Sequence, residues 1–247
     1  MNGSNAAKVV SQDSYYGSEN HAATLMRIAN FPDDVLSLLQ LETLVAINAI
    51  QRYGCTAVVE LGCYDGRSIE LSRSLDLRYV GVDINPQAIR SLTRRIADEH
   101  LEGRAEAVLA DALDLDQWAD RVREQRPLIH LPFNFLGSFQ SPLVLLNRLC
   151  RMPNAFLLIS VFNTSRYTTD VRRRYYSACG VRDLKVTCGG LDAAIFTGER
   201  NFFSRAFAPE MLESLFEECG ADTLLLSTNR LGICVVAKPL EAGEILR

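Results

Sequence analysis

From residue 57 onward the sequence alternates short apolar runs with longer amphipathic stretches. The apolar runs have the length of buried strands, and the stretches between them place apolar residues at helical spacing. A strand that is followed by a helix and then by another strand pairs in parallel, with the helix crossing one face of the sheet. The pattern therefore predicts a doubly wound α/β fold. The predicted strands are 57–61, 79–83, 105–110, 128–131 and 156–162, and the predicted helices are 68–75, 86–99, 115–124 and 142–152.

The regions on either side of this alternation predict further elements. Before it, apolar residues recur at helical spacing up to Gly54, which predicts a long helix that faces the core. After it, two short runs around Gly189 predict a hairpin, and residues 209–219 predict a helix that ends at Gly220. The last two runs, 223–227 and 232–237, are joined by a turn too short for a crossover helix, so they should pair antiparallel. We therefore expect a seven-stranded, mostly parallel sheet with an antiparallel last strand.

The length of 247 residues and the apolar content of 48% fit one domain with additions. We expect residues 1–54 to form an N-terminal helical lid and a packing helix. We expect residues 55–247 to form the main domain, with a small cap inserted near 164–205. No run approaches the roughly 20 apolar residues of a membrane-spanning helix, and the polar start lacks a secretory signal, so we expect a cytoplasmic protein. The seven cysteines include no Cys-x-x-Cys pair, which predicts reduced thiols and no metal site.

The segment from Val58 to Ser68 leads from an apolar strand through a turn of small residues into a helix. In a doubly wound fold, ligands bind at the carboxyl ends of the strands, where glycines such as Gly62 and Gly66 let the backbone approach them. The second predicted strand ends at Asp83 and the third at Asp111. Three neighbouring strand ends thus bring a glycine loop and two carboxylates to one edge of the sheet. This arrangement predicts a nucleotide-type binding site.

These residues resemble those of the class I S-adenosylmethionine-dependent methyltransferases, a family with a Rossmann-like sheet and a glycine loop that reads E/D-x-G-x-G-x-G. Glu60 falls on the acid of that motif, and Tyr64 replaces its middle glycine, where a side chain disfavours a positive φ angle. The resemblance implies that Asp83 accepts the ribose hydroxyls and that Asp111 lies near the adenine amino group. The cofactor-binding residues that it implies are Glu60, Gly62, Cys63, Tyr64, Gly66, Asp83, Ile84, Asp111, Ala112 and Tyr15.

The main alternative for the same loop is a nicotinamide-dependent Rossmann enzyme. Such enzymes usually carry G-x-G-x-x-G, and this loop has no glycine at Tyr64 or Arg67, so its spacing fits that motif poorly. The joint spacing of the loop with the two strand-end acids favours the methyltransferase interpretation.

The end of the fourth predicted strand normally meets the acceptor in this family. We interpret residues 132–137 as one wall of the acceptor pocket and Asn134 as the best candidate for a hydrogen bond to the acceptor or the donor. The order Pro-Phe-Asn differs from the Asn/Asp-Pro-Pro-aromatic motif of enzymes that methylate amino groups of nucleic-acid bases. His130 is a candidate catalytic base, and the alternative is a buried imidazole inside an apolar strand.

Two more regions are candidates for the ligand side of the molecule. Tyr16 is a candidate catalytic group, and Tyr15 a candidate lid residue that closes over the donor; the alternative is that both pack the first helix. The aromatic residues of the cap suggest a pocket for a flat or apolar molecule, although core packing is the more common explanation of such rings. Arg172–Arg174 are candidates for binding an acidic acceptor or, alternatively, a solvated helix face.

The sequence thus predicts methyl transfer from S-adenosyl-L-methionine to a nitrogen or oxygen of a small-molecule acceptor, with S-adenosyl-L-homocysteine as the product. The alternatives are a protein that binds the cofactor without methylating, through structural use or cyclisation, and then a protein or RNA methyltransferase. The net charge of −4 provides no overall field that would attract nucleic acid. We expect neither nucleic acid nor membrane as a partner. The sequence leaves open a homodimer, the identity of the acceptor and its receiving atom.

Overall fold

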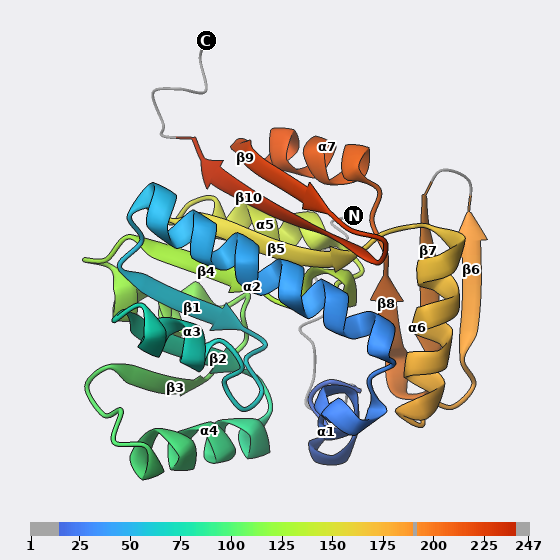
Figure 1. Ribbon diagram of the computed structural model, residues 1–247, viewed down its shortest axis with the longest axis horizontal. Helices are drawn as coiled ribbons and strands as arrows, with labels where there is room; N and C mark the ends of the chain where they lie inside the picture. Colours follow the sequence, from blue (N-terminus) through green and yellow to red (C-terminus); the bar gives the residue numbers. More distant parts are fainter. Residues whose placement is uncertain (1–14, 190–191, 241–247) are drawn as a thin grey trace, which may run out of the picture.

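The computed structural model describes residues 15–189 and 192–240. Its centre is a seven-stranded sheet with the order β3-β2-β1-β4-β5-β10-β9 (Figure 1). All neighbours from β3 to β5 pair in parallel, and β10 pairs antiparallel with both β5 and β9. The strands are β1 (Ala57–Leu61), β2 (Arg78–Asp83), β3 (Ala105–Leu109), β4 (Pro127–Leu131), β5 (Phe156–Phe162), β9 (Ala221–Thr228) and β10 (Gly232–Pro239). The predicted topology, with its antiparallel last strand, is confirmed.

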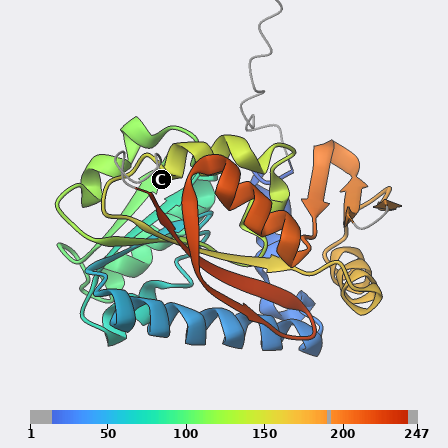
Figure 2. The ribbon, with the colours of Figure 1, turned by 90° about the horizontal axis from the view of Figure 1, so that it is seen from above.

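Helices cover both faces of this sheet, as the crossover argument predicts. Figure 2 shows α2 on one side of the sheet and α5 and α7 on the other. The first face carries α2 (Asp33–Tyr53), α3 (Ile69–Ser74) and α4 (Pro86–Asp98), and the second carries α5 (Pro142–Leu149) and α7 (Pro209–Cys219). Gly54 and Gly220 end α2 and α7 in the left-handed conformation, which glycine adopts without steric cost.

A separate layer stands beside the carboxyl end of β5 (Figure 1). This layer, which we call the cap, consists of the helix α6 (Arg166–Ala178) and a three-stranded antiparallel sheet. The strands of the small sheet are β6 (Lys185–Gly189), β7 (Asp192–Gly198) and β8 (Phe202–Arg205). Two short helical segments, α1 (Glu19–Met26) and η1 (Ile28–Asn30), precede α2. Aromatic side chains of α6, β7 and β8 form one buried cluster with Tyr15. The cap is therefore joined to the start of the described chain through a shared core.

The structure differs from the sequence-based expectation at residues 115–124. A single helix was expected there, and two short 3-10 turns are found, η2 (Leu115–Gln117) and η3 (Ala119–Val122). Trp118, the single tryptophan, lies between them with a φ of −136° and is fully buried in the main core. The backbone leaves helical geometry at the residue that places this large ring inside. Among the described residues, no helix combines the length and the apolar character that crossing a bilayer requires.

Candidate functional site

The loop after β1 runs through three left-handed residues at the carboxyl edge of the sheet. Gly62, Tyr64 and Gly66 have φ angles of 70°, 49° and 82°. Tyr64 thus keeps the conformation that its side chain disfavours, at a cost of about 1 kcal/mol. Its N–H donates to Oδ2 of Asp83 over 2.9 Å. This hydrogen bond between the loop and the end of β2 holds the unfavourable backbone angle in place.

Both glycines of the loop are required by space as well as by φ. A Cβ atom on Gly62 would lie 2.4 Å from Cδ2 of Phe135, and one on Gly66 would lie 2.5 Å from Cδ1 of Leu92. Phe135 opens the 3-10 turn η4 (Phe135–Ser138) after β4. The donor loop that the sequence predicted therefore contacts the segment predicted to meet the acceptor.

Asp83 and Asp111 follow one another along the same edge. Oδ1 of Asp83 accepts the N–H of Asn85 over 2.8 Å, and burial raises the pKa of its carboxyl group. Oδ1 of Asp111 accepts the N–H of Leu113 over 2.9 Å. Because β2 and β3 pair in register up to Asp83, the two carboxylates lie on adjacent strand ends, as the sequence predicted.

Glu60 lies beneath the loop rather than in front of it. The side chain is buried, and its Oε2 accepts the N–H of Ser68 over 3.0 Å and the hydroxyl of Tyr79 over 2.7 Å. Burial raises the pKa of Glu60 to about 7. The carboxyl group therefore ties the first turn of α3 to β2, and through it supports the loop from below.

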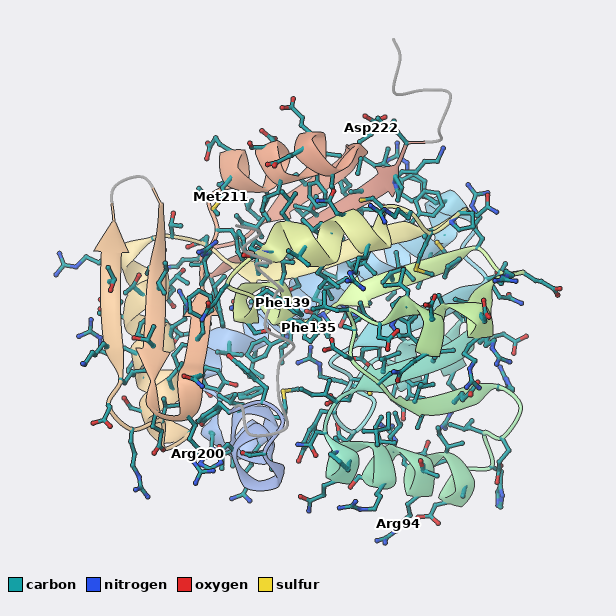
Figure 3. The ribbon with its side chains drawn as sticks, turned by 180° about the vertical axis from the view of Figure 1, so that it is seen from behind. Arg94, Phe135, Phe139, Arg200, Met211 and Asp222 are labelled. Atoms are coloured by element: carbon teal, nitrogen blue, oxygen red, sulfur yellow. The ribbon has the colours of Figure 1, made fainter. Side chains whose placement is uncertain are left out.

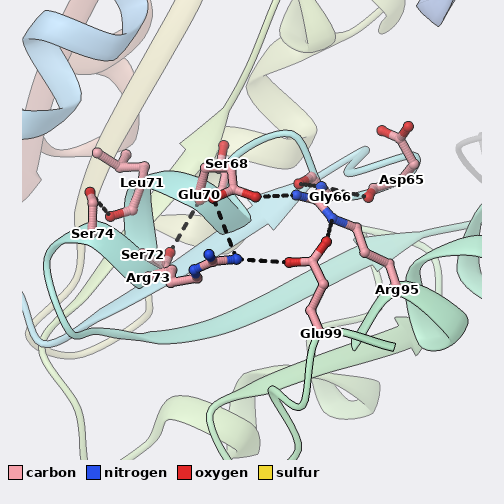
Figure 4. Close-up of polar contacts among 10 residues, drawn as sticks. All are labelled: Asp65, Gly66, Ser68, Glu70, Leu71, Ser72, Arg73, Ser74, Arg95 and Glu99. Atoms are coloured by element: carbon pink, nitrogen blue, oxygen red, sulfur yellow. Dashed lines mark hydrogen bonds and ion pairs between the residues drawn. The ribbon is translucent and has the colours of Figure 1, made fainter. Parts of the chain in front are cut away.

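On its outer side the loop is held by Arg95 of α4 (Figure 4). The guanidinium group donates to the carbonyl oxygens of Gly66 over 3.0 Å and Asp65 over 3.4 Å. It also pairs with Glu99 over 2.9 Å and with Glu70. The loop carbonyls thus point toward a cation that is itself fixed by two carboxylates.

On its inner side the loop is tied to α2 by Glu42. Oε1 of this buried carboxylate accepts a hydrogen bond from Nη2 of Arg67 over 2.9 Å, and Oε2 accepts one from the N–H of Phe133 over 2.8 Å. Burial alone would raise the pKa of Glu42, but the charge of Arg67 and the hydrogen bond from Phe133 hold it below its usual range. Sequence reasoning missed Glu42. The available signal was an acid on the apolar stripe of α2, four residues after Leu38.

The turn after β4 has two consecutive left-handed residues, Phe133 and Asn134, with φ angles of 42° and 64°. Oδ1 of Asn134 accepts the N–H of Phe162 over 3.1 Å, and its Nδ2 donates to Oγ of Ser204 over 3.0 Å. Asn134 therefore joins β4 to β5 and to the cap. Its predicted contact with an acceptor stays a prediction.

His130 of β4 is buried on the face of the sheet that α2 covers. Its Nδ1 is 3.0 Å from Oγ of Ser68, and its Nε2 is 3.7 Å from Oε1 of Glu42. Burial lowers the pKa of His130 to about 4, so the imidazole is neutral at pH 7. A neutral imidazole has the protonation state of a base, but both of its nitrogens face groups of the protein. Its predicted catalytic role stays a prediction.

Tyr15 and Tyr16 lie against the cap strand β8. The hydroxyl of Tyr16 donates to the carbonyl oxygen of Phe203 over 2.6 Å, and burial raises its pKa well above the usual range. The Tyr15 ring is fully buried 4.9 Å from the ring of Phe202, and burial raises its pKa to about 12. Their predicted contacts with donor or acceptor stay predictions, since the contacts described are all with the protein. The remaining predicted cofactor residues, Cys63, Ile84 and Ala112, follow the strand ends at the same edge.

Figure 3 shows Phe135 and Phe139 between the cap strands and the central sheet. The two rings meet edge to face with their centroids 5.3 Å apart, and both are partly exposed. They form an aromatic wall next to the loop, within the segment that the sequence predicted as the acceptor side. The aromatic rings of the cap, in contrast, pack mainly against each other and against Tyr15.

No protein-family model matches the sequence, and neither does any curated protein. Solved structures match the fold. The 1,6-didemethyltoxoflavin-N1-methyltransferase of Burkholderia thailandensis, solved with 1,6-didemethyltoxoflavin and S-adenosylhomocysteine bound, has a TM-score of 0.60 and 13% identity, covering 91% of this chain and 92% of its own. The CcbJ methyltransferase of Streptomyces caelestis has a TM-score of 0.57 and 14% identity, covering 81% and 94%.

A third similar structure is a methyltransferase of Methanosarcina mazei that depends on S-adenosylmethionine. It has a TM-score of 0.53 and 21% identity, covering 75% of this chain and 93% of its own. The chain therefore has the fold of the methyltransferases that use S-adenosylmethionine, and the predicted fold class is confirmed.

Proposed function

We propose that this protein is an S-adenosylmethionine-dependent methyltransferase that methylates a nitrogen or oxygen of a small molecule and releases S-adenosylhomocysteine. The observation that carries the proposal is the hydrogen bond from Tyr64 N to Asp83, with Asp111 on the neighbouring strand end. It brings the glycine loop and the two predicted acids into one continuous edge, within a fold that such enzymes share.

The residues at this edge fit an adenosyl donor. Each carboxylate oxygen has two lone pairs, and in Asp83 Oδ2 accepts the N–H of Tyr64 while Oδ1 accepts the N–H of Asn85. The half-buried carboxylate keeps acceptor capacity for ribose hydroxyls. In Asp111 the described contact is on Oδ1, which leaves Oδ2 for a donor such as an exocyclic amine.

When bound, the donor supplies a methyl group on a sulfonium centre that already carries its leaving group. The protein therefore contributes alignment and exclusion of water. We assign alignment to the loop from Gly62 to Gly66, which Arg95 and Glu42 hold from two sides. We assign exclusion of water to the aromatic wall of Phe135 and Phe139.

The three residues predicted as catalytic form hydrogen bonds with segments that surround the proposed acceptor site. Asn134 joins the turn after β4 to the cap, His130 lies beneath the loop, and Tyr16 is bonded to β8. We propose that they act by holding the turn, the loop and the cap strand β8 in place, respectively. Direct proton transfer by His130 or Tyr16 remains the alternative, and an acceptor analogue that binds within hydrogen-bond distance of either would support it.

A small acceptor is supported by three observations. The cap stands beside the site, the net charge is −4, and the Burkholderia enzyme of the same fold was solved with a small molecule bound. A cytoplasmic location and the absence of nucleic-acid and membrane partners belong to the same proposal. Cofactor binding without methylation, and methylation of protein or RNA, remain the alternatives, and a homodimer is compatible with all of them.

Titration calorimetry with S-adenosylhomocysteine tests the donor site. We expect the intact chain to bind, and Asp83→Ala to weaken binding about tenfold to a hundredfold, because the variant removes the acceptor of charge-assisted hydrogen bonds. The matched control is Asp222→Ala on β9, an exposed acid on the edge strand opposite β3; Figure 3 labels it. Absence of binding by the intact chain would refute the proposal.

Methyl transfer itself is tested by incubation with a methyl-labelled donor and a library of small nitrogen and oxygen nucleophiles. Transfer of label to a member of the library is the expected result. Donor binding without transfer to any small molecule, protein or RNA would favour the non-methylating alternative.

A further inference from the structure

The carboxylate of Glu42 is shared between the two loops of the proposed site. One oxygen accepts from the side chain of Arg67, which follows Gly66 in the donor loop, and the other accepts from the backbone of Phe133 after β4. Arg67 and Phe133 also contact each other directly, since the guanidinium carbon lies 5.4 Å from the centroid of the Phe133 ring. The three residues contact one another in pairs, and we call this set of contacts the Glu42 bridge.

The carboxylate of the bridge is protected from solvent. Glu42 is 4% exposed, and its pKa is held below the usual range, so the carboxylate is charged at neutral pH. Hydrogen bonds to a buried charge are stronger than those between neutral groups. A rigid helix, α2, carries this carboxylate and therefore fixes the position of both loops relative to the sheet.

The turn that the bridge holds is a strained one. Phe133 has a φ of 42° and Asn134 a φ of 64°, and both angles are disfavoured for a residue that carries a side chain. The N–H that Glu42 accepts belongs to the first of these two residues. Loss of the carboxylate would therefore release the turn toward more favourable backbone angles.

We propose that Glu42 is a positioning residue that couples the donor loop to the turn after β4, so that a ligand that orders the loop also orders the turn. This inference rests on the proposed function, because it takes the loop as the place where the donor binds. Ordering of the loop fixes Arg67, which fixes the Glu42 carboxylate, and the carboxylate in turn holds the N–H of Phe133. Coupling of this kind typically amounts to about 5-fold or more between two sites.

Hydrogen exchange read by mass spectrometry, with and without S-adenosylhomocysteine, tests the coupling. In the unchanged protein we expect the ligand to slow exchange in residues 62–68 and also, about 5-fold or more, in residues 132–137. In Glu42→Gln we expect ligand binding and protection of 62–68 to persist, while ligand-dependent protection of 132–137 is lost. Gln still accepts the N–H of Phe133 but cannot pair with the charge of Arg67.

The matched control is Asp34→Asn, which removes another α2 carboxylate from an ion pair, the one with Arg174 over 2.9 Å. It should keep the ligand-dependent protection of 132–137, whereas a general weakening of α2 would reduce it in both variants. Retained protection in Glu42→Gln, or equal loss in the control, would overturn the inference. Loss of all ligand binding in Glu42→Gln would also overturn it, since the residue would then be part of the donor site.

A second variant, Arg67→Gln, tests the inference without the ligand. It also provides a test if Glu42→Gln fails to fold. Its change lies on the donor loop and removes both the ion pair with Glu42 and the contact with the Phe133 ring, so faster exchange in 132–137, by about tenfold, is expected if the bridge transmits it. Unchanged exchange there would overturn the inference. Absence of ligand binding by the unchanged protein would instead count against the proposed function, and the ligand-free comparison would still decide the bridge.

Discussion

At the residue scale, Gly62 shows how closely the two sides of the site approach. Its φ of 70° is strained for any side chain, and a Cβ would overlap the Phe135 ring at 2.4 Å. Gly54 has a similar φ of 63° but nothing within 4 Å of its Cβ position. Alanine substitution at Gly54 therefore tests backbone strain alone, whereas substitution at Gly62 tests backbone strain together with steric overlap with Phe135.

We expect Gly54→Ala to lower the free energy of unfolding by about 1 kcal/mol and Gly62→Ala by about 2–4 kcal/mol. Gly62→Ala should also weaken binding of S-adenosylhomocysteine, because Phe135 must move away from the loop. Chemical denaturation of both variants measures the difference. Equal destabilisation would show that Phe135 moves aside without cost.

Two buried titratable groups beneath the loop give opposite pH dependences. Burial raises the pKa of Glu60 from 4.5 to about 7, so the folded state keeps a proton that the unfolded chain releases, and stability falls as pH rises through this range. Burial lowers the pKa of His130 from 6.5 to about 4, so the unfolded chain binds a proton that the folded state does not, and stability falls as pH drops through this range. Between 4.5 and 6.5 the two contributions oppose each other.

We therefore expect the two contributions to cancel largely in the unchanged protein, so that together they change its free energy of unfolding little between pH 4.5 and 6.5. In His130→Gln only the Glu60 contribution remains, so the free energy of unfolding should decrease as the pH rises toward 7. Glu60→Gln should leave the His130 contribution, so that stability declines toward pH 4. Urea denaturation at several pH values measures the slopes, and parallel curves for all three proteins would contradict the assignment.

At the element scale, the cap is held by a buried cation that the sequence suggested as a ligand-binding or solvated group. Arg172 of α6 is fully buried and donates to the carbonyl oxygens of Ala194 over 2.8 Å and Ser204 over 2.7 Å. Its guanidinium carbon lies 4.7 Å from the centroid of the Phe196 ring. Arg173, the next residue, is exposed. The arginine run therefore includes one structural anchor of β7 and β8.

We expect Arg172→Leu to lower the free energy of unfolding by about 2–4 kcal/mol, because it leaves two buried carbonyl groups without donors. Limited proteolysis should then cleave within residues 180–205 before the central sheet. Arg173→Leu is the control and should change stability by less than about 0.5 kcal/mol. Similar proteolysis patterns for the two variants would contradict the anchoring role.

At the scale of the whole molecule, the cap is joined both to the central sheet and to the start of the described chain. Asn134, after β4, bonds to Ser204 of β8, and Asn163, just after β5, forms a β-bridge with Phe207, just after β8. Tyr16 bonds to Phe203 of β8. These contacts lie around the proposed site. Binding there should therefore stabilise the protein as a unit, and not the sheet alone.

We expect S-adenosylhomocysteine at about 100 times its Kd to raise the free energy of unfolding by about 2.7 kcal/mol. For a protein of this size that corresponds to an increase in Tm of roughly 5–10 °C. Differential scanning calorimetry should show a single transition that shifts as a whole. A shift confined to one of two resolved transitions would show that the cap unfolds independently.

The sheet and the order of residues along its edge could be predicted from the sequence. Short-range periodicity and helix-ending glycines such as Gly54 and Gly220 are local properties, so the strands, most helices and the antiparallel last strand were predictable. The strand ends then fixed the neighbourhood of Gly62, Asp83 and Asp111, since parallel strands bring their carboxyl ends together.

Which side chains meet across that framework depends on how the elements pack together. It placed Trp118 in the core at the expense of the helix expected over 115–124, and it kept Tyr64 left-handed through a hydrogen bond to Asp83. It also paired Glu42 with two loops that lie 25 and 91 residues away in the chain. A residue inside the apolar stripe of a helix reveals that it is buried, but not what it binds, because its partners are set by packing between distant segments.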